Sequence, residues 1–105
     1  MPPECAAAFD ERSLEAVLAM IEPTRCRILV LLRQRGPMSV QDIAKNFKSG
    51  RPAISHHLKV LKSSGLVQAE REGQEIFYSV LMPRITGTLR ALADSLESCC
   101  KESSK

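Results

Sequence analysis

The sequence has few aromatic residues and no long apolar run. Phe, Trp and Tyr make up 4% of the 105 residues, and tryptophan is absent. The core must therefore be aliphatic, which favours helix-on-helix packing over a β-sandwich. No apolar run reaches the roughly 20 residues that a transmembrane helix needs, and the first residues lack the basic and apolar regions of a secretory signal. We therefore expect one small domain in the cytoplasm, with no membrane partner.

The motifs of an enzyme are also missing. The sequence contains no Gly-rich phosphate loop and no pair of acids suited to acid–base catalysis. Its two histidines, His56 and His57, are adjacent in a basic segment, and we expect them to act as part of that segment and not in catalysis. We therefore expect a protein that is not an enzyme. The four cysteines should stay reduced in the cytoplasm, so we interpret them as thiols, metal ligands or redox sensors before disulfides.

The segment from residue 51 to residue 78 carries the most informative pattern. Ile54, Leu58 and Leu61 recur at helical spacing, so this side of a helix should face a core. From Arg51 to Lys62 the chain has three basic side chains, two histidines and no acid. Such a helix suits insertion into a DNA groove. The net charge of +3 is mild, so a solvated basic face is the alternative interpretation.

The periodicity of the whole chain predicts a mainly α-helical fold with a small β-hairpin. It indicates four helices, then two strands, then a fifth helix, over residues 10–21, 23–35, 40–46, 51–64, 66–71, 75–80 and 83–100. Two short helices joined by a Gly-containing turn form a helix-turn-helix. Gly73 permits the positive φ of a tight hairpin, which would be the wing. The prediction is a winged helix-turn-helix.

The first and last predicted helices carry apolar stripes that a small winged domain cannot easily cover. These stripes are Leu14, Val17, Leu18 and Ile21, and Ile85, Leu89, Leu92 and Leu96. We expect a homodimer through these two helices, with packing inside one subunit as the alternative. A two-fold dimer would present two recognition helices to a palindromic DNA operator. The expected organisation is a flexible arm (1–9), a DNA-binding and dimerisation domain (10–98) and a Cys-containing tail (99–105).

Several segments resemble the ArsR/SmtB family of winged-helix repressors. They are Pro23-Thr24-Arg25 with its following helix, the stretch RPAISHHLKVL from Arg51, Ser64-Gly65-Leu66-Val67, and the wing at 71–74 closed by Tyr78-Ser79. The resemblance spans roughly residues 10 to 98. It implies a dimeric DNA-binding repressor that releases its operator on binding a metal or metalloid, or on thiol modification. Two positions depart from the pattern: Glu22 replaces the frequent Asp, and Gly50 replaces the usual Ser, for which Ser49 is the expected substitute.

The helix-turn-helix and the wing supply the predicted DNA contacts. Ser55 and His56 are interpreted as base or phosphate contacts, against the alternative of a surface cap and a solvated imidazole. His57, one step round the helix, is expected to be structural. The full set of predicted contacts is Gln41, Lys48, Arg51, Pro52, Ser55, His56, Lys59, Arg71 and Gln74.

The cysteines are the candidate sensor. The resemblance implies that zinc and nickel sites on the last helix combine Asp or Glu with His, and here Asp94 and Glu97 have no such partner. Thiolates select soft acceptors, and the vicinal pair Cys99-Cys100 resembles that of arsenic-sensing family members. The expected inducer is trivalent arsenic, as arsenite or an organoarsenical, or antimonite as its analogue. No organic cofactor is expected.

Trivalent arsenic prefers three thiolates, and Cys5 on the predicted arm is the expected third ligand. Cys26 is the alternative third ligand. Another interpretation keeps the fold but makes the thiols a redox or persulfide sensor, with Cys26 paired to Cys99 or Cys100. A winged-helix module that binds protein instead of DNA is a further alternative.

Overall fold

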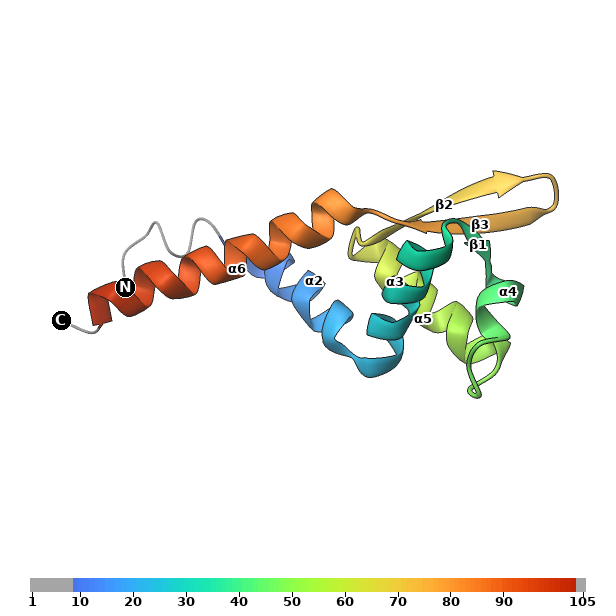
Figure 1. Cartoon of the computed structure of the whole chain (residues 1–105), viewed down its shortest axis with the longest axis horizontal. Helices are drawn as coiled ribbons and strands as arrows, with labels where there is room; N and C mark the ends of the chain where they lie inside the picture. The colour runs from blue at the N-terminus through green and yellow to red at the C-terminus, as the bar shows by residue number, and fades with distance from the viewer. Residues whose placement is uncertain (1–8, 104–105) are drawn as a thin grey trace.

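The computed structural model describes residues 9–103, with side chains described through residue 98. The elements run in the order α2 (Glu11–Ile21), α3 (Pro23–Arg35), β1 (Met38–Ser39), α4 (Val40–Ala44), α5 (Arg51–Ser63), β2 (Val67–Glu72), β3 (Glu75–Val80) and α6 (Met82–Ser103). In Figure 1 the hairpin and α3 to α5 gather at one end, and α6 extends away from them with α2 alongside. This is the winged helix-turn-helix that the sequence predicted.

Side chains cap three of the helices at the predicted starts. Asp10 Oδ1 accepts a hydrogen bond of 3.0 Å from Ser13 N–H at α2, and Ser39 Oγ accepts one of 3.2 Å from Asp42 N–H at α4. Glu22 Oε1 accepts a hydrogen bond of 2.8 Å from the Arg25 N–H, so Glu22 caps α3. Each cap satisfies a backbone donor that has no partner inside the helix.

The helix α5 begins differently. Its N-cap residue is Gly50, with a φ of 87°, and no described side chain makes a capping hydrogen bond there. The prediction that Ser49 substitutes as the cap is therefore wrong. Glycine adopts positive φ readily, and Pro52, near the helix start, has no N–H that needs a partner. The start of α5 therefore depends on the backbone conformation of Gly50 and not on a side-chain cap.

The sheet contains a strand that the sequence did not predict. Its order is β1-β3-β2, and Met38 and Ser39 of β1 pair with Tyr78 and Phe77 of β3. A two-residue strand is too short to show an alternating pattern. Because α4 begins at Val40, directly after Ser39, the start of α4 is attached to a strand that pairs with β3 of the wing.

A single aliphatic core holds the helix-turn-helix. The predicted stripe of Ile54, Leu58 and Leu61 on α5 is completely buried. It packs in one cluster with buried residues of the other elements, among them Ile28, Leu32, Ile43, Leu66 and Val67. Because this face is fixed inward, the opposite face of α5 must point to solvent.

Two helix ends differ from the prediction. The helix α4 ends at Ala44 instead of Asn46, because Asn46 Nδ2 donates to the Asp42 carbonyl at 3.0 Å and closes the turn. The helix α6 continues to Ser103 instead of ending near residue 100. No glycine or proline follows Gly87, so no helix-breaking residue interrupts α6 between Gly87 and Ser103. None of the helices in the described part of the chain combines the length and apolarity needed to cross a membrane.

Candidate nucleic-acid interface

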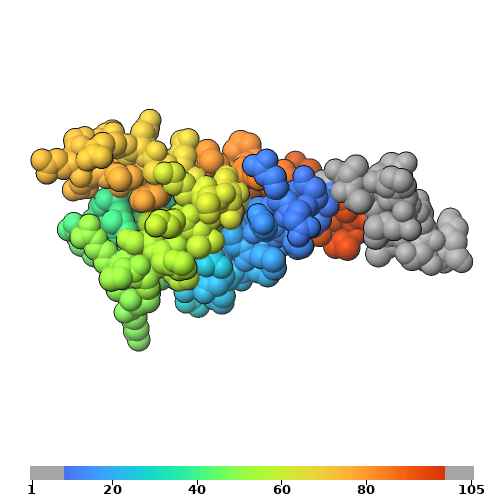
Figure 2. All heavy atoms as spheres, turned by 180° about the vertical axis from the view of Figure 1, so that it is seen from behind, coloured from blue at the N-terminus to red at the C-terminus, as the bar shows by residue number. Residues whose placement is uncertain are grey.

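The outward face of α5 carries the side chains predicted to read DNA. Ser55, His56 and Lys59 are exposed, as are Arg51 and Pro52 in the first turn. In Figure 2, α5 (yellow-green) lies between the wing and α2 on one face of the molecule. The face is therefore open to a partner along most of the helix.

Four predicted DNA-contact residues line one hollow of about 200 Å³. Gln41 comes from α4, Arg51 and Ser55 come from α5, and Gln74 comes from the turn of the hairpin. The pairing of β1 with β3 sets α4 beside the wing and so helps to bring these side chains together. Hydroxyl, amide and guanidinium groups at one place can hydrogen-bond to base edges and to phosphates.

The other five predicted contacts lie outside this hollow. Lys48, Pro52, His56 and Lys59 are exposed on α5 or in the turn before it. Arg71 on β2 is also exposed, and its Nε donates to the Gly73 carbonyl at 3.3 Å, which holds the side chain beside the wing turn.

The charges of this surface are unevenly distributed. Glu75 lines the hollow, and Glu70 and Glu72 are exposed on β2, so the wing carries several acids. The basic charge comes instead from α5 and its preceding turn. A phosphate backbone would therefore be attracted mainly to α5.

His57 belongs to a different environment from its neighbour His56. His57 is half-buried, and its Nδ1 lies 3.2 Å from a terminal guanidinium nitrogen of Arg25. The Nε of Arg25 donates to the Ala19 carbonyl at 2.7 Å. Glu22 Oε1 lies 4.0 Å from His57 Nδ1. The network joins α2, α3 and α5, so the position of His57 agrees with its expected structural role.

The hydrogen bond from the Arg25 N–H lowers the pKa of Glu22, and the charges of His57 and Arg25 act in the same direction, while burial opposes them. Sequence spacing did not reveal the contact between Arg25 and His57, because the two residues lie on separate helices.

The cysteines fall into two groups. Cys26 is an exposed free thiol at the edge of an apolar groove of about 730 Å³, which is lined by Met20, Val30 and Leu89 among others. The side chains of Cys5, Cys99 and Cys100 lie outside the described residues. Among the side chains that are described, no three His, Cys, Asp or Glu residues gather at one place.

The apolar stripes of α2 and α6 divide between the core and the surface. Val17 and Ile85 are buried inside the subunit. Leu14, Leu18 and Ile21 on α2 remain 41%, 53% and 61% exposed, and Leu89 and Leu96 on α6 remain 44% and 56% exposed. The predicted stripes therefore leave a large apolar surface uncovered within one subunit.

Comparisons with known proteins agree with this architecture. Residues 22–69 match the family described as bacterial regulatory protein, arsR family. A helix-turn-helix transcriptional regulator of Methanocaldococcus jannaschii is 40% identical over 86 residues, which cover 82% of this chain and 96% of that protein.

Two solved structures are also similar. A crystal structure described as a possible transcriptional regulator for arsenical resistance has a TM-score of 0.70 and 36% identity, and covers 78% of this chain and 83% of its own. The homodimeric winged helix-turn-helix DNA-binding domain of a Mycobacterium bovis protein has a TM-score of 0.67 and 28% identity, and covers 83% of this chain and 82% of its own.

These relatives are transcriptional regulators and not enzymes. The match covers the helix-turn-helix and the start of the wing, and the relative from Methanocaldococcus is matched over nearly its whole length. The chain belongs to the ArsR/SmtB family of winged-helix, DNA-binding transcriptional repressors.

Proposed function

We propose that this repressor binds a palindromic operator as a homodimer and releases it when trivalent arsenic binds to cysteines near the end of α6. The DNA-binding part of this proposal rests on one observation: a single hollow is lined by Gln41, Arg51, Ser55 and Gln74. Arginine pairs bidentately with guanine and glutamine with adenine. Ser55, one turn after Arg51, suits a phosphate or a base edge.

Binding of a fluorescent duplex, selected by the wild-type protein from a random pool, tests this reading surface. Arg51→Gln should weaken binding by about tenfold or more, because one good base or phosphate contact contributes about 1–3 kcal/mol. Arg35→Gln is the matched control, since Arg35 is an exposed arginine at the end of α3. Equal affinities of the two variants would contradict the assignment.

The uncovered apolar surface supports the homodimer. Leu18 and Leu96 are each more than half exposed, on the two helices that lie side by side outside the helix-turn-helix. At about 25 cal/mol per Å² of apolar area, covering such side chains is strongly favourable. The Mycobacterium bovis relative is itself described as homodimeric. A two-fold dimer places two α5 helices about one turn of DNA apart, which suits a palindrome.

The vicinal pair Cys99-Cys100 supports arsenic as the inducer. Thiolates select soft metal and metalloid ions, and one relative is described as a possible regulator for arsenical resistance. Adjacent residues on a regular helix point about 100° apart, so one arsenic atom can bind both thiolates only if α6 distorts there. Leu96 lies one turn before Cys99. The distortion would therefore reach the proposed dimer contact and change the spacing of the two α5 helices.

Native mass spectrometry after addition of arsenite tests the ligands. We expect one arsenic atom per subunit in the wild-type protein, loss of binding in Cys99→Ser and Cys100→Ser, and weaker binding in Cys5→Ser. Cys26→Ser is the control and should bind as the wild type does. Loss of arsenic in the Cys26 variant alone would contradict the proposed ligand set.

A thiol-oxidation sensor is the second candidate, and the exposed Cys26 thiol favours it. Cys26 and Leu89 line the same groove. A regular helix would place Cys99 about 15 Å beyond Leu89, whereas a disulfide needs Cα atoms within about 7 Å. A bond to Cys26 would thus form with the partner subunit. Peroxide or polysulfide should then produce a covalent dimer on a non-reducing gel, and arsenite should not release DNA.

A further inference from the structure

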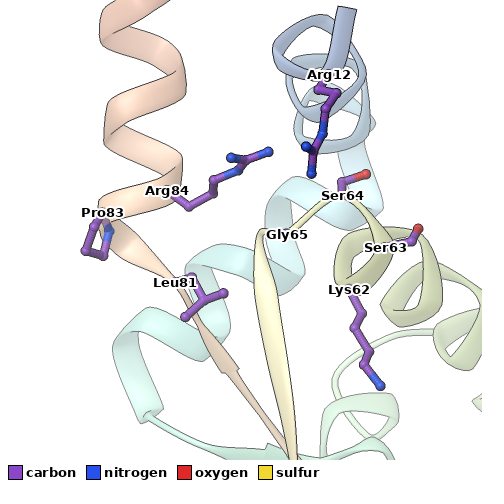
Figure 3. Close-up of a pocket in the computed structure, with 8 residues that line it drawn as sticks. All are labelled: Arg12, Lys62, Ser63, Ser64, Gly65, Leu81, Pro83 and Arg84. Atoms are coloured by element: carbon purple, nitrogen blue, oxygen red, sulfur yellow. The ribbon is translucent and has the colours of Figure 1, made fainter.

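A basic hollow of about 430 Å³ lies where α5 ends and where α2 and α6 begin. Figure 3 shows the guanidinium groups of Arg12 and Arg84 directed toward the space above Ser64. Lys62 also lines the hollow, and none of the described lining residues is acidic. The reading surface proposed above uses none of these residues.

The backbone fixes the position of Arg84 relative to the end of α5. Leu81 N–H donates to the Leu66 carbonyl at 2.9 Å and ties the start of α6 to the turn after α5. Gly65 in that turn has a φ of +79°, and a Cβ there would lie 3.3 Å from Arg84 Nε. Arg84 therefore lies directly against the Gly65 backbone, where a larger residue would crowd it.

The guanidinium groups of Arg12 and Arg84 point toward the same space, whereas the ammonium group of Lys62 extends away from them at the edge of the hollow (Figure 3). The ion pairs of the described residues involve neither Arg12, Lys62 nor Arg84. Asp10 interacts electrostatically with Arg12, although the hydrogen bond from the Ser13 N–H is the main cause of the lowered pKa of Asp10. The Ser64 hydroxyl makes no hydrogen bond to another described residue and faces the same space. Two guanidinium groups and a hydroxyl form a donor set suited to a phosphate group.

The face of α5 indicates where this phosphate comes from. Lys62 follows Ser55 by seven residues and Lys59 by three, so the three side chains lie on one face of the helix. The distance along the axis from Ser55 to Lys62 is about 10 Å, or roughly three base pairs of DNA. The exposed reading face therefore leads directly into the hollow.

The residues that line the hollow come from α2, from the end of α5 and the turn after it, and from the start of α6, so the hollow lies at the end of α5 nearest the two helices of the proposed dimer contact. Arg12 precedes Leu14 by two residues, which places it about 200° around α2 from that exposed leucine. A partner subunit that covers Leu14 and Leu18 would leave Arg12 accessible. We propose that the hollow binds a backbone phosphate of the operator, on the side of each half-site nearest the dimer axis. This inference rests on the proposed DNA binding.

The salt dependence of duplex binding tests the proposal. The double variant Arg12→Gln/Arg84→Gln should lower the slope of log affinity against log salt by about 1 per subunit, and equally for selected and random duplexes. Arg35→Gln is the matched control and should keep the wild-type slope. Ethylation of phosphates near the operator centre should weaken binding by the wild-type protein but not by the double variant. Because the two arginines are exposed, thermal unfolding should be unchanged.

Two outcomes would overturn the proposal. One is an unchanged salt slope and an unchanged ethylation pattern in the double variant. The other combines two results: the DNA-free wild-type protein binds inorganic phosphate and the double variant does not, while the salt slope of duplex binding is the same for both proteins. That outcome would assign the hollow to a small anion. A wild-type protein that binds no duplex would instead contradict the proposed function, and the phosphate titration would still test the hollow.

Discussion

Arg25 and His57 lie on different helices, and their side chains meet with 3.2 Å between a terminal guanidinium nitrogen and Nδ1. The contact links α3 to α5, and the Nε of Arg25 extends it to the Ala19 carbonyl at the end of α2. His56, the preceding residue, is exposed on the face that we assign to DNA. Two adjacent histidines therefore have different expected roles.

Alanine substitution should separate these roles. His57→Ala removes the partner of Arg25 and should lower the free energy of unfolding by about 1 kcal/mol, the usual net contribution of a hydrogen bond. His56→Ala should change stability by less than about 0.5 kcal/mol, as for other surface positions, but should weaken duplex binding. Urea unfolding and anisotropy measure the two effects. The reverse pattern would place His57 on the DNA.

Leu58 and Lys59 test the two faces of α5. Leu58 is completely buried, so Leu58→Ala should destabilise the protein by about 2–5 kcal/mol through lost burial and a cavity. Lys59→Ala, one residue later, should leave the unfolding midpoint nearly unchanged and reduce the salt slope of duplex binding. If Leu58→Ala cost less than about 1 kcal/mol, the helix would not be anchored as described.

The cap of α3 should contribute a pH-dependent part of the stability. The Arg25 N–H lowers the pKa of Glu22 below its ordinary value of 4.5 in the folded state. The stabilisation is therefore present above the unfolded-state pKa and is lost as the pH falls through the folded-state value. Between about pH 5 and pH 3, Glu22→Gln should lose less stability than the wild-type protein. Parallel denaturation curves for the two proteins over this range would argue against the cap.

The exposed leucines of α2 should hold the dimer. Leu18→Glu places a charge on an apolar surface and should shift the protein to a monomer in sedimentation velocity, with its helix content retained. Ile76→Glu is the matched control, because Ile76 is 41% exposed on the wing and lies on neither α2 nor α6. A Leu18→Glu protein that still sediments as a dimer would place the interface elsewhere.

The parts of this molecule that depend on local sequence could be predicted. The buried stripe of α5, the caps Asp10 and Ser39, and the positive φ of Gly73 each follow from spacing or from one residue's chemistry. The strand β1 could not be found, since two residues carry no periodicity. The cap at Gly50 was missed because a glycine provides no side chain from which capping can be inferred.

Contacts between segments that are distant in the sequence could not be predicted from the sequence pattern. The hollow formed by Arg12, Lys62 and Arg84 draws one cation from each of three helices, and only the fold brings them together. The same holds for Arg25 and His57. By contrast, the residues that we assign to the reading surface could be proposed from the sequence, because most of them follow one another on α5 and its flanks.

The most direct test of the account is the affinity for the selected duplex with and without arsenite. The measurement compares the wild-type protein with the double variant Cys99→Ser/Cys100→Ser, in anisotropy titrations under reducing conditions. Saturating arsenite should raise the wild-type Kd at least tenfold, which corresponds to a coupling of about 1.4 kcal/mol, and should leave the Kd of the double variant unchanged. A wild-type Kd that does not move, or a double variant that responds as fully as the wild type, would contradict arsenic release through these two cysteines.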